Sequence, residues 1–339
     1  MAGRTRGMIL AAGLGKRLRP LTYFRAKAAV PFLNRPLISY SLELFREAEI
    51  PEVMVNLHHL AETVRAAVTE RSVRVSFSIE DEILGTAGCL RRVSDFLEGN
   101  TFIVSNGKTY FEQDLREVLE EHRRSGSLVT MVLVPYSPGD PYNPVMLGAD
   151  GCIVGFARNR EADFGSESSD YERLCIYTGV QILEPDILDW IPPGASDSVN
   201  DIYPRLMTEG LPIRGFVSDA YWCECSTPRR YLSKSLEVLG LQKRENSSLS
   251  ELPRDCRGAI VGKNVDVPPS TVIENSVLWG EVKLGVHSSF RSVIITDGVR
   301  ELPADTHLSD VIITPIREGQ AEFQTVCTIA GQYAVWPLS

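Results

Sequence analysis

The segment from Met8 to Pro36 has the residue types of a phosphate-binding turn. Its apolar start predicts a short buried strand, and the strand stops at a glycine turn, Gly13-Leu14-Gly15. Basic side chains follow at once: Lys16, Arg17 and Arg19. Glycine has no Cβ, so such a turn brings backbone N–H groups close to a phosphate, and nearby cations neutralise its charge. A G-x-G turn alone is more often an ordinary loop, so the wider pattern has to decide.

Two further segments are placed to meet a ligand. Gly85-Thr86-Ala87-Gly88 opens a predicted helix, where small residues allow backbone N–H groups to face a ligand, although such a tetrapeptide standing alone more often serves close packing. Asn106-Gly107-Lys108 follows a predicted strand at 101–105. Open α/β sheets bind ligands at the carboxyl ends of their strands. Both segments are therefore candidate parts of one site.

Histidines and cysteines do not form a convincing metal site in the sequence. His58 and His59 are neighbours on a predicted helix, so their side chains point about 100° apart. Cys223 and Cys225 are the only close pair among seven cysteines, and no second pair completes a zinc site. We read the cysteines as reduced thiols.

The full pattern of the first segment resembles the signature loop of the sugar-1-phosphate nucleotidyltransferases. It reads G-x-G-x-R-L-x-P-L-T, then a lysine at Lys27, then V-P-F-x-x-x-P-L. Leu84–Gly88 reads L-G-T-A-G, as in the segment of that family that faces the nucleotide base. Tyr177–Val180 resembles the family's sugar-facing strand. The likeness extends in particular to mannose-1-phosphate and heptose-1-phosphate guanylyltransferases.

The resemblance implies a role for each matching position. Arg17 would contact the departing pyrophosphate and Lys27 the α-phosphate, which makes them the catalytic candidates. The implied nucleotide-binding residues are Leu10, Ala11, Ala12, Gly13, Gly15, Gly85, Thr86, Gly88 and Asn106. The implied sugar-binding residues are Gly107, Thr178 and Gly179.

The chain departs from the family at both metal-binding positions. The resemblance implies Mg²⁺ held by the Asp of an N-G-D and the Asp of a W-x-D-x-G-T-P, and here these positions are Lys108 and Glu224. An ammonium repels a divalent cation, and Glu reaches one methylene further than the near-octahedral Mg²⁺ geometry suits. An E-K-P triplet is also missing, and Arg158 or Arg160 either binds phosphate in its place or is a solvated loop charge.

Alternating strand and helix patterns predict the elements that carry these residues. Strands are predicted at 53–57, 73–79, 101–105, 128–134 and 175–183, and helices at 37–48, 58–70, 85–96, 112–125 and 227–239. Such alternation predicts βαβ units on a largely parallel sheet. The resemblance implies a Rossmann-like mixed sheet flanked by helices, the GT-A-like form of an α/β fold.

A six-residue repeat replaces these patterns near the C-terminus. Its apolar positions are Val272, Leu278, Leu284, Phe290, Leu302 and Leu308. A period of six is typical of the hexapeptide β-helix, with about eighteen residues in a coil. We predict a nucleotidyltransferase-like domain at 1–240, a linker at 241–258, a left-handed β-helix at 259–313 and a tail or cap at 314–339. A β-helix of so few coils leaves the backbone groups of its terminal strands unpaired. We therefore expect this edge to be capped or paired with another chain.

Length, composition and charge limit the classes of protein to which the chain can belong. A chain of 339 residues with 43% hydrophobic residues can bury a sizeable core and predicts two domains. No apolar run reaches the roughly 18 residues of a membrane span, and the run after the basic start is too short for a signal peptide. We therefore predict a cytoplasmic protein with no membrane partner. A net charge of −9 argues against a nucleic-acid partner.

Two hypotheses for function remain open. The changes at Lys108 and Glu224 favour a protein that binds a nucleotide or NDP-sugar with impaired catalysis and no metal cofactor. It would act as a sensor or regulatory subunit, in a homo-oligomer or hetero-oligomer formed through the β-helix. The alternative is an active enzyme that makes a GDP-sugar or similar product with Mg²⁺ in an unusual site, Lys108 replacing part of the metal's charge. The sequence names neither the base nor the sugar.

Overall fold

The computed structural model describes residues 5–70, 72–157, 171–245, 256–316 and 327–338. Its contacts fall into two compact units, 1–14 with 37–223 and 15–36 with 224–339. The two units are described in turn. Among the helices of the described residues, none combines the length and the apolar character that crossing a membrane requires.

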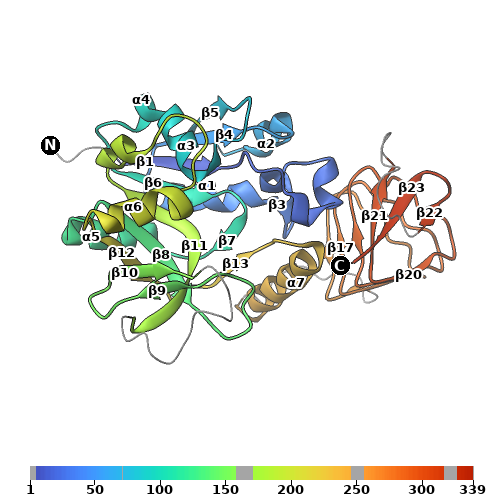
Figure 1. Cartoon of the computed structure of the whole chain (residues 1–339). Helices are drawn as coiled ribbons and strands as arrows, with labels where there is room; N and C mark the ends of the chain where they lie inside the picture. The colour runs from blue at the N-terminus through green and yellow to red at the C-terminus, as the bar shows by residue number, and fades with distance from the viewer. Residues whose placement is uncertain (1–4, 71, 158–170, 246–255, 317–326, 339) are drawn as a thin grey trace. The chain divides into compact units, whose positions relative to one another are not determined.

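The first unit is built on a nine-stranded mixed sheet in the order β10-β9-β11-β6-β1-β4-β5, with β8 paired to β11 and β12 (Figure 1). Its strands are β1 (Arg6–Leu10), β4 (Glu52–Leu57), β5 (Arg74–Ile79), β6 (Phe102–Asn106), β8 (Val129–Pro135), β9 (Val145–Leu147), β10 (Ile153–Phe156), β11 (Arg173–Leu183) and β12 (Ile213–Val217). β1 lies parallel between β4 and β6, and β11 runs antiparallel to β6. The mixed α/β fold is as predicted.

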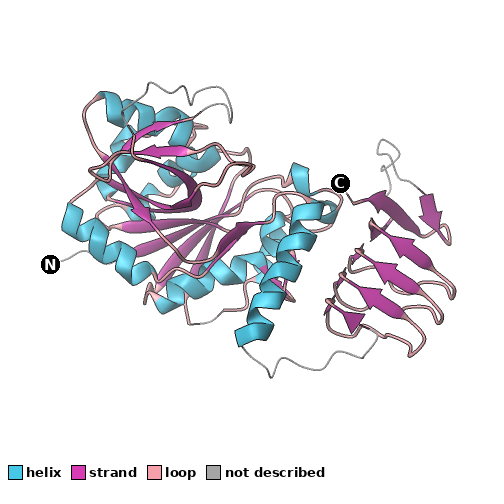
Figure 2. Cartoon of the chain, turned by 90° about the horizontal axis from the view of Figure 1, so that it is seen from below, coloured by secondary structure: helices cyan, strands magenta, loops and turns pink. Residues whose placement is uncertain are grey.

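Helices flank this sheet (Figure 2). They are α1 (Leu37–Glu47), α2 (Ala61–Ala67), α3 (Gly85–Arg92), α4 (Ser94–Leu97), α5 (Leu115–Ser125) and α6 (Tyr203–Thr208), with a 3-10 helix at Pro185–Trp190 and a π-helix at Ser198–Ile202. The helical spacing of apolar residues correctly predicted the buried face of α1, because Leu37, Ile38 and Phe45 on that face are fully buried. The single helix predicted at 85–96 is wrong in detail, since the backbone of Val93 leaves the helical region and separates α3 from α4.

Two short strands form a separate pair beyond the carboxyl end of β6. β7 (Thr109–Phe111) follows β6 after a tight turn and pairs with β13 (Trp222–Glu224). The backbone N–H of Glu112 donates to Tyr221 O over 3.1 Å beside this pair. β13 ends at Glu224, which is the residue at which the second unit resumes.

In the second unit, the segment 15–36 folds into three single 3-10 turns and a hairpin. The turns are Lys16–Leu18, Leu21–Tyr23 and Lys27–Ala29, and the hairpin pairs β2 (Pro31–Phe32) with β3 (Arg35–Pro36). α7 (Pro228–Glu245) follows Thr227 and continues six residues past its predicted end, into the predicted linker. Residues 246–255 of that linker lie outside the described part of the chain.

The C-terminal repeats form stacked parallel strands, as a β-helix requires (Figure 2). One face stacks β14 (Cys256–Arg257), β16 (Val272–Glu274), β18 (Ser289–Arg291) and β20 (His307–Ser309), and the next stacks β15 (Ile260–Val261), β17 (Val277–Leu278), β19 (Ile294–Ile295) and β21 (Val311–Pro315). Bridges at Asp266, Lys283 and Glu301 mark a third face. The predicted apolar positions Leu278, Leu284 and Phe290 are 0–2% exposed.

The end of the chain closes one edge of this stack. β23 (Tyr333–Pro337) runs antiparallel to β21, and β22 (Cys327–Ile329) pairs with β23. Inside the same unit, the segment 15–36 bonds to the coils although the two are far apart in the sequence (Figure 1). Asn34 Nδ2 donates to Val261 O over 2.9 Å, and Arg25 forms an ion pair with Asp297.

Candidate functional site

A small cavity lies where β1 and β6 end in the first unit. It has a volume of about 250 Å³, and its wall includes Leu10, Thr86, Asn106, Tyr177, Asp197 and Asn200. Leu10 and Asn106 are direct partners in the parallel ladder of β1 and β6, and Gly107 N donates to Leu10 O over 3.1 Å. The structure thus brings together three residues that the sequence had assigned to nucleotide binding.

A buried hydrogen-bond network fixes the start of the glycine turn to the start of α3. Asn56 Oδ1 accepts from Ala11 N at 2.8 Å, and Asn56 Nδ2 donates to Glu80 Oε1 at 2.7 Å. Glu80 Oε2 accepts from Leu84 N at 3.0 Å, and its side chain is only 2% exposed. A buried carboxylate is tolerated when its oxygens are hydrogen-bonded in this way. Sequence reasoning missed both Asn56 and Glu80, whose only signal was a polar residue at the end of an apolar strand.

The glycines of the G-T-A-G segment serve close packing. A Cβ added at Gly88 would lie 2.2 Å from the carbonyl oxygen of Gly194, and one at Gly85 would lie 2.4 Å from that of Ser196. Ser196 O also accepts from Ala87 N at 3.0 Å. These contacts occupy the helix start with protein backbone, so of the predicted residues here only Thr86 lines the cavity.

Thr86 fixes the opposite wall through Asp197. Its hydroxyl donates to Asp197 Oδ2 over 2.9 Å and accepts from Ser198 N over 2.8 Å. Asp197 Oδ1 also accepts from Asn200 N and from Asn200 Nδ2, both at 2.9 Å. The wall of the cavity is therefore held by a capped turn, as expected where Asp precedes a helical segment.

The residues predicted to bind sugar have mainly structural contacts. Gly179 has φ +87°, and a Cβ there would lie 2.2 Å from Asn106 Nδ2, so this glycine makes room for the Asn106 side chain. Thr178 is 1% exposed and its hydroxyl donates to Val132 O over 2.8 Å. Neither these two residues nor Gly107 lines the small cavity, and none of the three lines the larger cavity that adjoins it.

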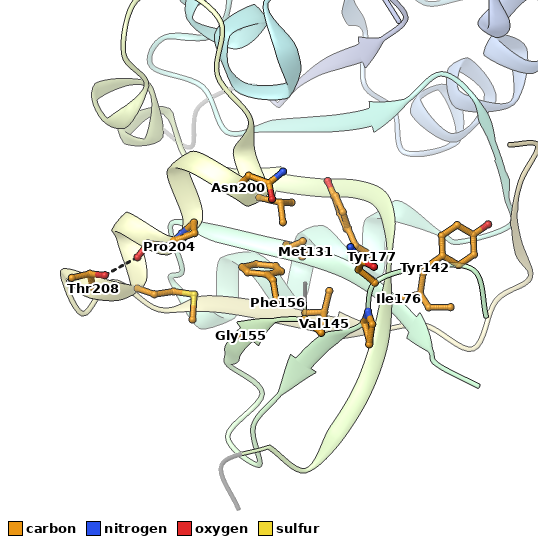
Figure 3. Close-up of a pocket in the computed structure, with 15 residues that line it drawn as sticks. Met131, Tyr142, Val145, Gly155, Phe156, Ile176, Tyr177, Asn200, Pro204 and Thr208 are labelled. Atoms are coloured by element: carbon orange, nitrogen blue, oxygen red, sulfur yellow. Dashed lines mark hydrogen bonds between the residues drawn. The ribbon is translucent and has the colours of Figure 1, made fainter. Parts of the chain in front are cut away.

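A larger cavity, of about 790 Å³, adjoins the small one in the first unit (Figure 3). The two cavities share Tyr177, Val199 and Asn200 in their walls. Burial raises the pKa of the Tyr177 phenol well above its ordinary value, so the hydroxyl stays protonated at physiological pH. Tyr177 can therefore donate a hydrogen bond but carries no charge.

In the signature loop, the glycine turn is open at Gly13 and closely packed against Thr22 and Lys27 at Gly15. Ala11 and Ala12 are buried, whereas Gly13 is exposed and no atom lies within 4 Å of a Cβ added to it. Gly15 has φ +61°, and its carbonyl oxygen accepts from the Thr22 hydroxyl at 3.0 Å. Arg17 is exposed.

Lys27 and Glu224 form an ion pair within the second unit. Lys27 Nζ lies 3.1 Å from Glu224 Oε1, and the two side chains are 12% and 9% exposed. The described residues offer no group of three His, Cys, Asp or Glu side chains that could hold a metal ion. The predicted ligand Glu224 faces the Lys27 ammonium, and Lys108 stands at the other predicted ligand position. These side chains do not fit the Mg²⁺ that the resemblance implies.

Lys108 lies in the tight turn between β6 and β7. Its backbone N–H donates to Asn106 O over 2.7 Å, and its side chain is half-buried. Arg158 and Arg160, the alternative phosphate ligands, lie outside the described residues.

Comparison with known proteins gives consistent matches. A model of the nucleotidyl transferase family matches residues 6–239. A UTP–glucose-1-phosphate uridylyltransferase of Synechocystis is 32% identical over 236 residues, which cover 65% of this chain and 59% of that protein. A mannose-1-phosphate guanylyltransferase of Mycobacterium tuberculosis is 26% identical over 296 residues, which cover 82% of this chain and 80% of that one. The crystal structure of HddC from Yersinia pseudotuberculosis complexed with GMP-PN has a similar fold, with TM-score 0.58 and 23% identity over 69% of this chain and 99% of that chain.

Proposed function

The chain belongs to the nucleotidyl transferase family, among the sugar-1-phosphate nucleotidyltransferases, and we propose that it binds a nucleotide or NDP-sugar while its catalysis is impaired. In an active member, an oxygen of the sugar 1-phosphate attacks the α-phosphorus of a nucleoside triphosphate, and pyrophosphate leaves. The protein contributes positioning and neutralisation of charge rather than covalent chemistry. Binding can therefore survive when the charge arrangement for catalysis is lost.

The Lys27–Glu224 ion pair is the observation that carries this proposal. Each charge is already neutralised by the other over 3.1 Å, in a largely buried place. A carboxylate engaged by an ammonium is a weak ligand for Mg²⁺, and an ammonium engaged by a carboxylate is a weak partner for a phosphate. The exposed Gly13 and the exposed Arg17 keep features suited to binding a phosphate.

The competing proposal is an active enzyme with Mg²⁺ in an unusual site or with Lys108 in place of the metal's charge. Two measurements separate the proposals. Pyrophosphate release is followed for a panel of nucleoside triphosphates and sugar 1-phosphates with and without Mg²⁺. Calorimetry measures the affinity of the same triphosphates and of their NDP-sugars. Binding without turnover supports impaired catalysis, and turnover in the native protein contradicts it.

A double variant adds a direct test of the changed positions. Lys108→Asp with Glu224→Asp restores the two carboxylates that the family resemblance implies. If the native protein is inert, magnesium-dependent turnover in the double variant supports a degenerate metal site. If the native protein is active and the double variant is slower, the native residues perform the catalysis.

We further propose a sensor or regulatory subunit in the cytoplasm, oligomeric through the β-helix. The stacked coils present short strand edges of the kind that pair with another chain. Light scattering coupled to size exclusion tests this. A monomer at all concentrations, alone or with an active homologue, would contradict it.

A further inference from the structure

The wall of the larger cavity in the first unit combines apolar and aromatic side chains with polar ones. Met131 reaches it from β8, Phe156 from β10 and Ile176 from β11 (Figure 3). Met207 of α6 also lines it. Its volume of about 790 Å³ falls in the range of small-molecule sites. None of the described residues that line it is charged. The group that enters it must therefore be uncharged and partly apolar.

The polar side chains of this wall are three hydroxyl groups and two amides, from Tyr142, Tyr177, Thr208, Asn143 and Asn200. The hydroxyl of Thr208 donates to Pro204 O over 2.9 Å, as Figure 3 marks. Asn200 Nδ2 donates to Asp197 Oδ1, and no other hydrogen bond of the Asn200 side chain is formed with the residues that the structure describes. Asn143 lies exposed among the lining residues. A fully hydroxylated sugar would lose hydrogen bonds to water here without replacing them all. Amide groups such as Asn143 and Asn200 instead match an amide on the ligand.

The position of the cavity relates it to the nucleotide. It shares Tyr177, Val199 and Asn200 with the small cavity, whose wall holds Leu10 and Asn106. A ligand can thus extend from one cavity into the other within the same unit. We propose that the larger cavity takes the glycosyl group of an N-acylamino sugar, whose amide pairs with Asn200 and whose acyl group packs on Phe156 and Met207. This inference rests on the proposed function for the phosphate and nucleotide end of the ligand.

Matched sugar phosphates test the inference. Calorimetry compares glucose 1-phosphate with N-acetylglucosamine 1-phosphate, and galactose 1-phosphate with N-acetylgalactosamine 1-phosphate. Each titration uses the protein alone and the protein saturated with the nucleoside diphosphate that it binds most tightly. We expect at least one N-acetyl compound to bind about tenfold or more tighter than its parent, because an apolar pocket discriminates by this much for one buried methyl group.

Variants identify the residues responsible. Phe156→Ser should reduce the preference to less than about threefold, because it removes the apolar wall and adds a hydroxyl. Met207→Gln on α6 provides a second, independent change should Phe156→Ser fold poorly. Val154→Ser is the matched control, because Val154 lies on the same strand, is 40% exposed and does not line the cavity. This control should keep the native preference.

The outcomes separate this inference from the proposed function. Equal or tighter binding of both parent sugars, or a preference that Phe156→Ser and Met207→Gln leave intact, overturns the assignment of the cavity. Nucleotide binding with no sugar phosphate binding also overturns it, while the proposed function stands. A preference for an N-acetyl compound without any nucleotide binding supports the cavity assignment and contradicts the proposed function.

Discussion

At the scale of single residues, the Lys27–Glu224 pair is the most consequential contact of the signature loop. Both side chains are nearly buried, so each ion has lost most of its hydration. The mutual attraction compensates for that loss only while both charges are present. Burial also explains why replacing one partner is costly, whereas exposed pairs on helices contribute little.

Glu224→Gln should lower the free energy of unfolding by about 2–4 kcal/mol, because it removes one charge of a largely buried ion pair. Urea denaturation of the variant and the native protein measures the difference. Glu237→Gln is the matched control, since Glu237 pairs with Lys234 over 2.7 Å on the surface of α7. The control should cost less than about 0.5 kcal/mol. Equal effects of the two substitutions would show that the buried pair does not matter for stability.

At the scale of elements, the start of α3 is fastened to the chain at 194–198. Gly88 lies so close to Gly194 O that any side chain would displace one of them. The displaced segment carries Asp197, which holds the wall of the small cavity through Thr86 and Asn200. Packing and site geometry are therefore coupled at this point.

Gly88→Ala should destabilise the protein by about 2–4 kcal/mol and weaken nucleotide binding, because the new methyl group overlaps the carbonyl oxygen of Gly194. Thermal unfolding and calorimetry measure the two effects. Gly240→Ala is the control, because Gly240 is also helical, in α7, and has open space at the Cβ position. Alanine should stabilise α7 by about 0.5–1 kcal/mol. A neutral Gly88→Ala would mean that the segment 194–198 moves aside at little cost.

A second element-scale feature is the buried His122 of α5. A carboxylate only accepts, so His122 Nε2–H donates to Glu184 Oε1 over 3.0 Å, and the Thr130 hydroxyl donates to Nδ1 over 2.8 Å. Thr101 also donates to Glu184 Oε1, over 2.9 Å. The network ties α5 to the beginnings of β6 and β8 and to the end of β11. Burial lowers the pKa of His122 below 6.5, against an opposing effect of Glu184.

This pKa shift predicts a loss of stability in mild acid. The unfolded chain takes up a proton on His122 as the pH falls through about 6.5, whereas the folded protein resists protonation until a lower pH. Stability from this residue is therefore present above pH 6.5 and declines below it. His122→Gln should reduce the difference in melting temperature between pH 7.5 and pH 5.5. Thr130→Val, which keeps the histidine, should retain a clear pH dependence, and an unchanged difference in His122→Gln would contradict the assignment.

Local sequence patterns predicted many of the helices and strands. They missed the contacts between segments that are far apart in the sequence. The strands β4 and β6 and the helices α1 and α5 follow from apolar periodicity, because each buries one face or both, whereas β5 was predicted by its alternation although its residues are only half-buried or exposed. The six-residue repeat likewise followed from spacing. The buried link from Ala11 through Asn56 and Glu80 to Leu84 did not, since it joins three segments whose polar residues look ordinary in isolation. Glu224 and Lys27 were each found by their motifs, but the ion pair between them could be identified only in the folded chain.

At the scale of the whole molecule, residues 15–36 of the signature loop belong to the same compact unit as the C-terminal coils. Tyr231 of α7 is fully buried and connects the two, because its hydroxyl donates to Pro31 O and accepts from Trp279 Nε1, the latter over 3.0 Å. Arg25 and Asn34 add the contacts to Asp297 and Val261. The coils therefore support the segment that carries Lys27.

A chain truncated after Glu245 should consequently lose the order of its signature loop. The truncation removes Trp279, Asp297 and Val261, so Tyr231 is uncovered and the loop loses the contacts that hold it. The amides of Ala29 and Val30 bond to Ala26 O and Lys27 O in the full chain, and they should exchange hydrogen at least about tenfold faster in the truncated one. Full-length Trp279→Phe, which loses only one hydrogen bond, is the control and should cost about 1 kcal/mol with the loop still protected. Because nucleotide affinity in the proposed function depends on this loop, it should fall together with the protection. Equal protection and equal affinity in the truncated chain would mean that the first 245 residues hold the loop without the coils.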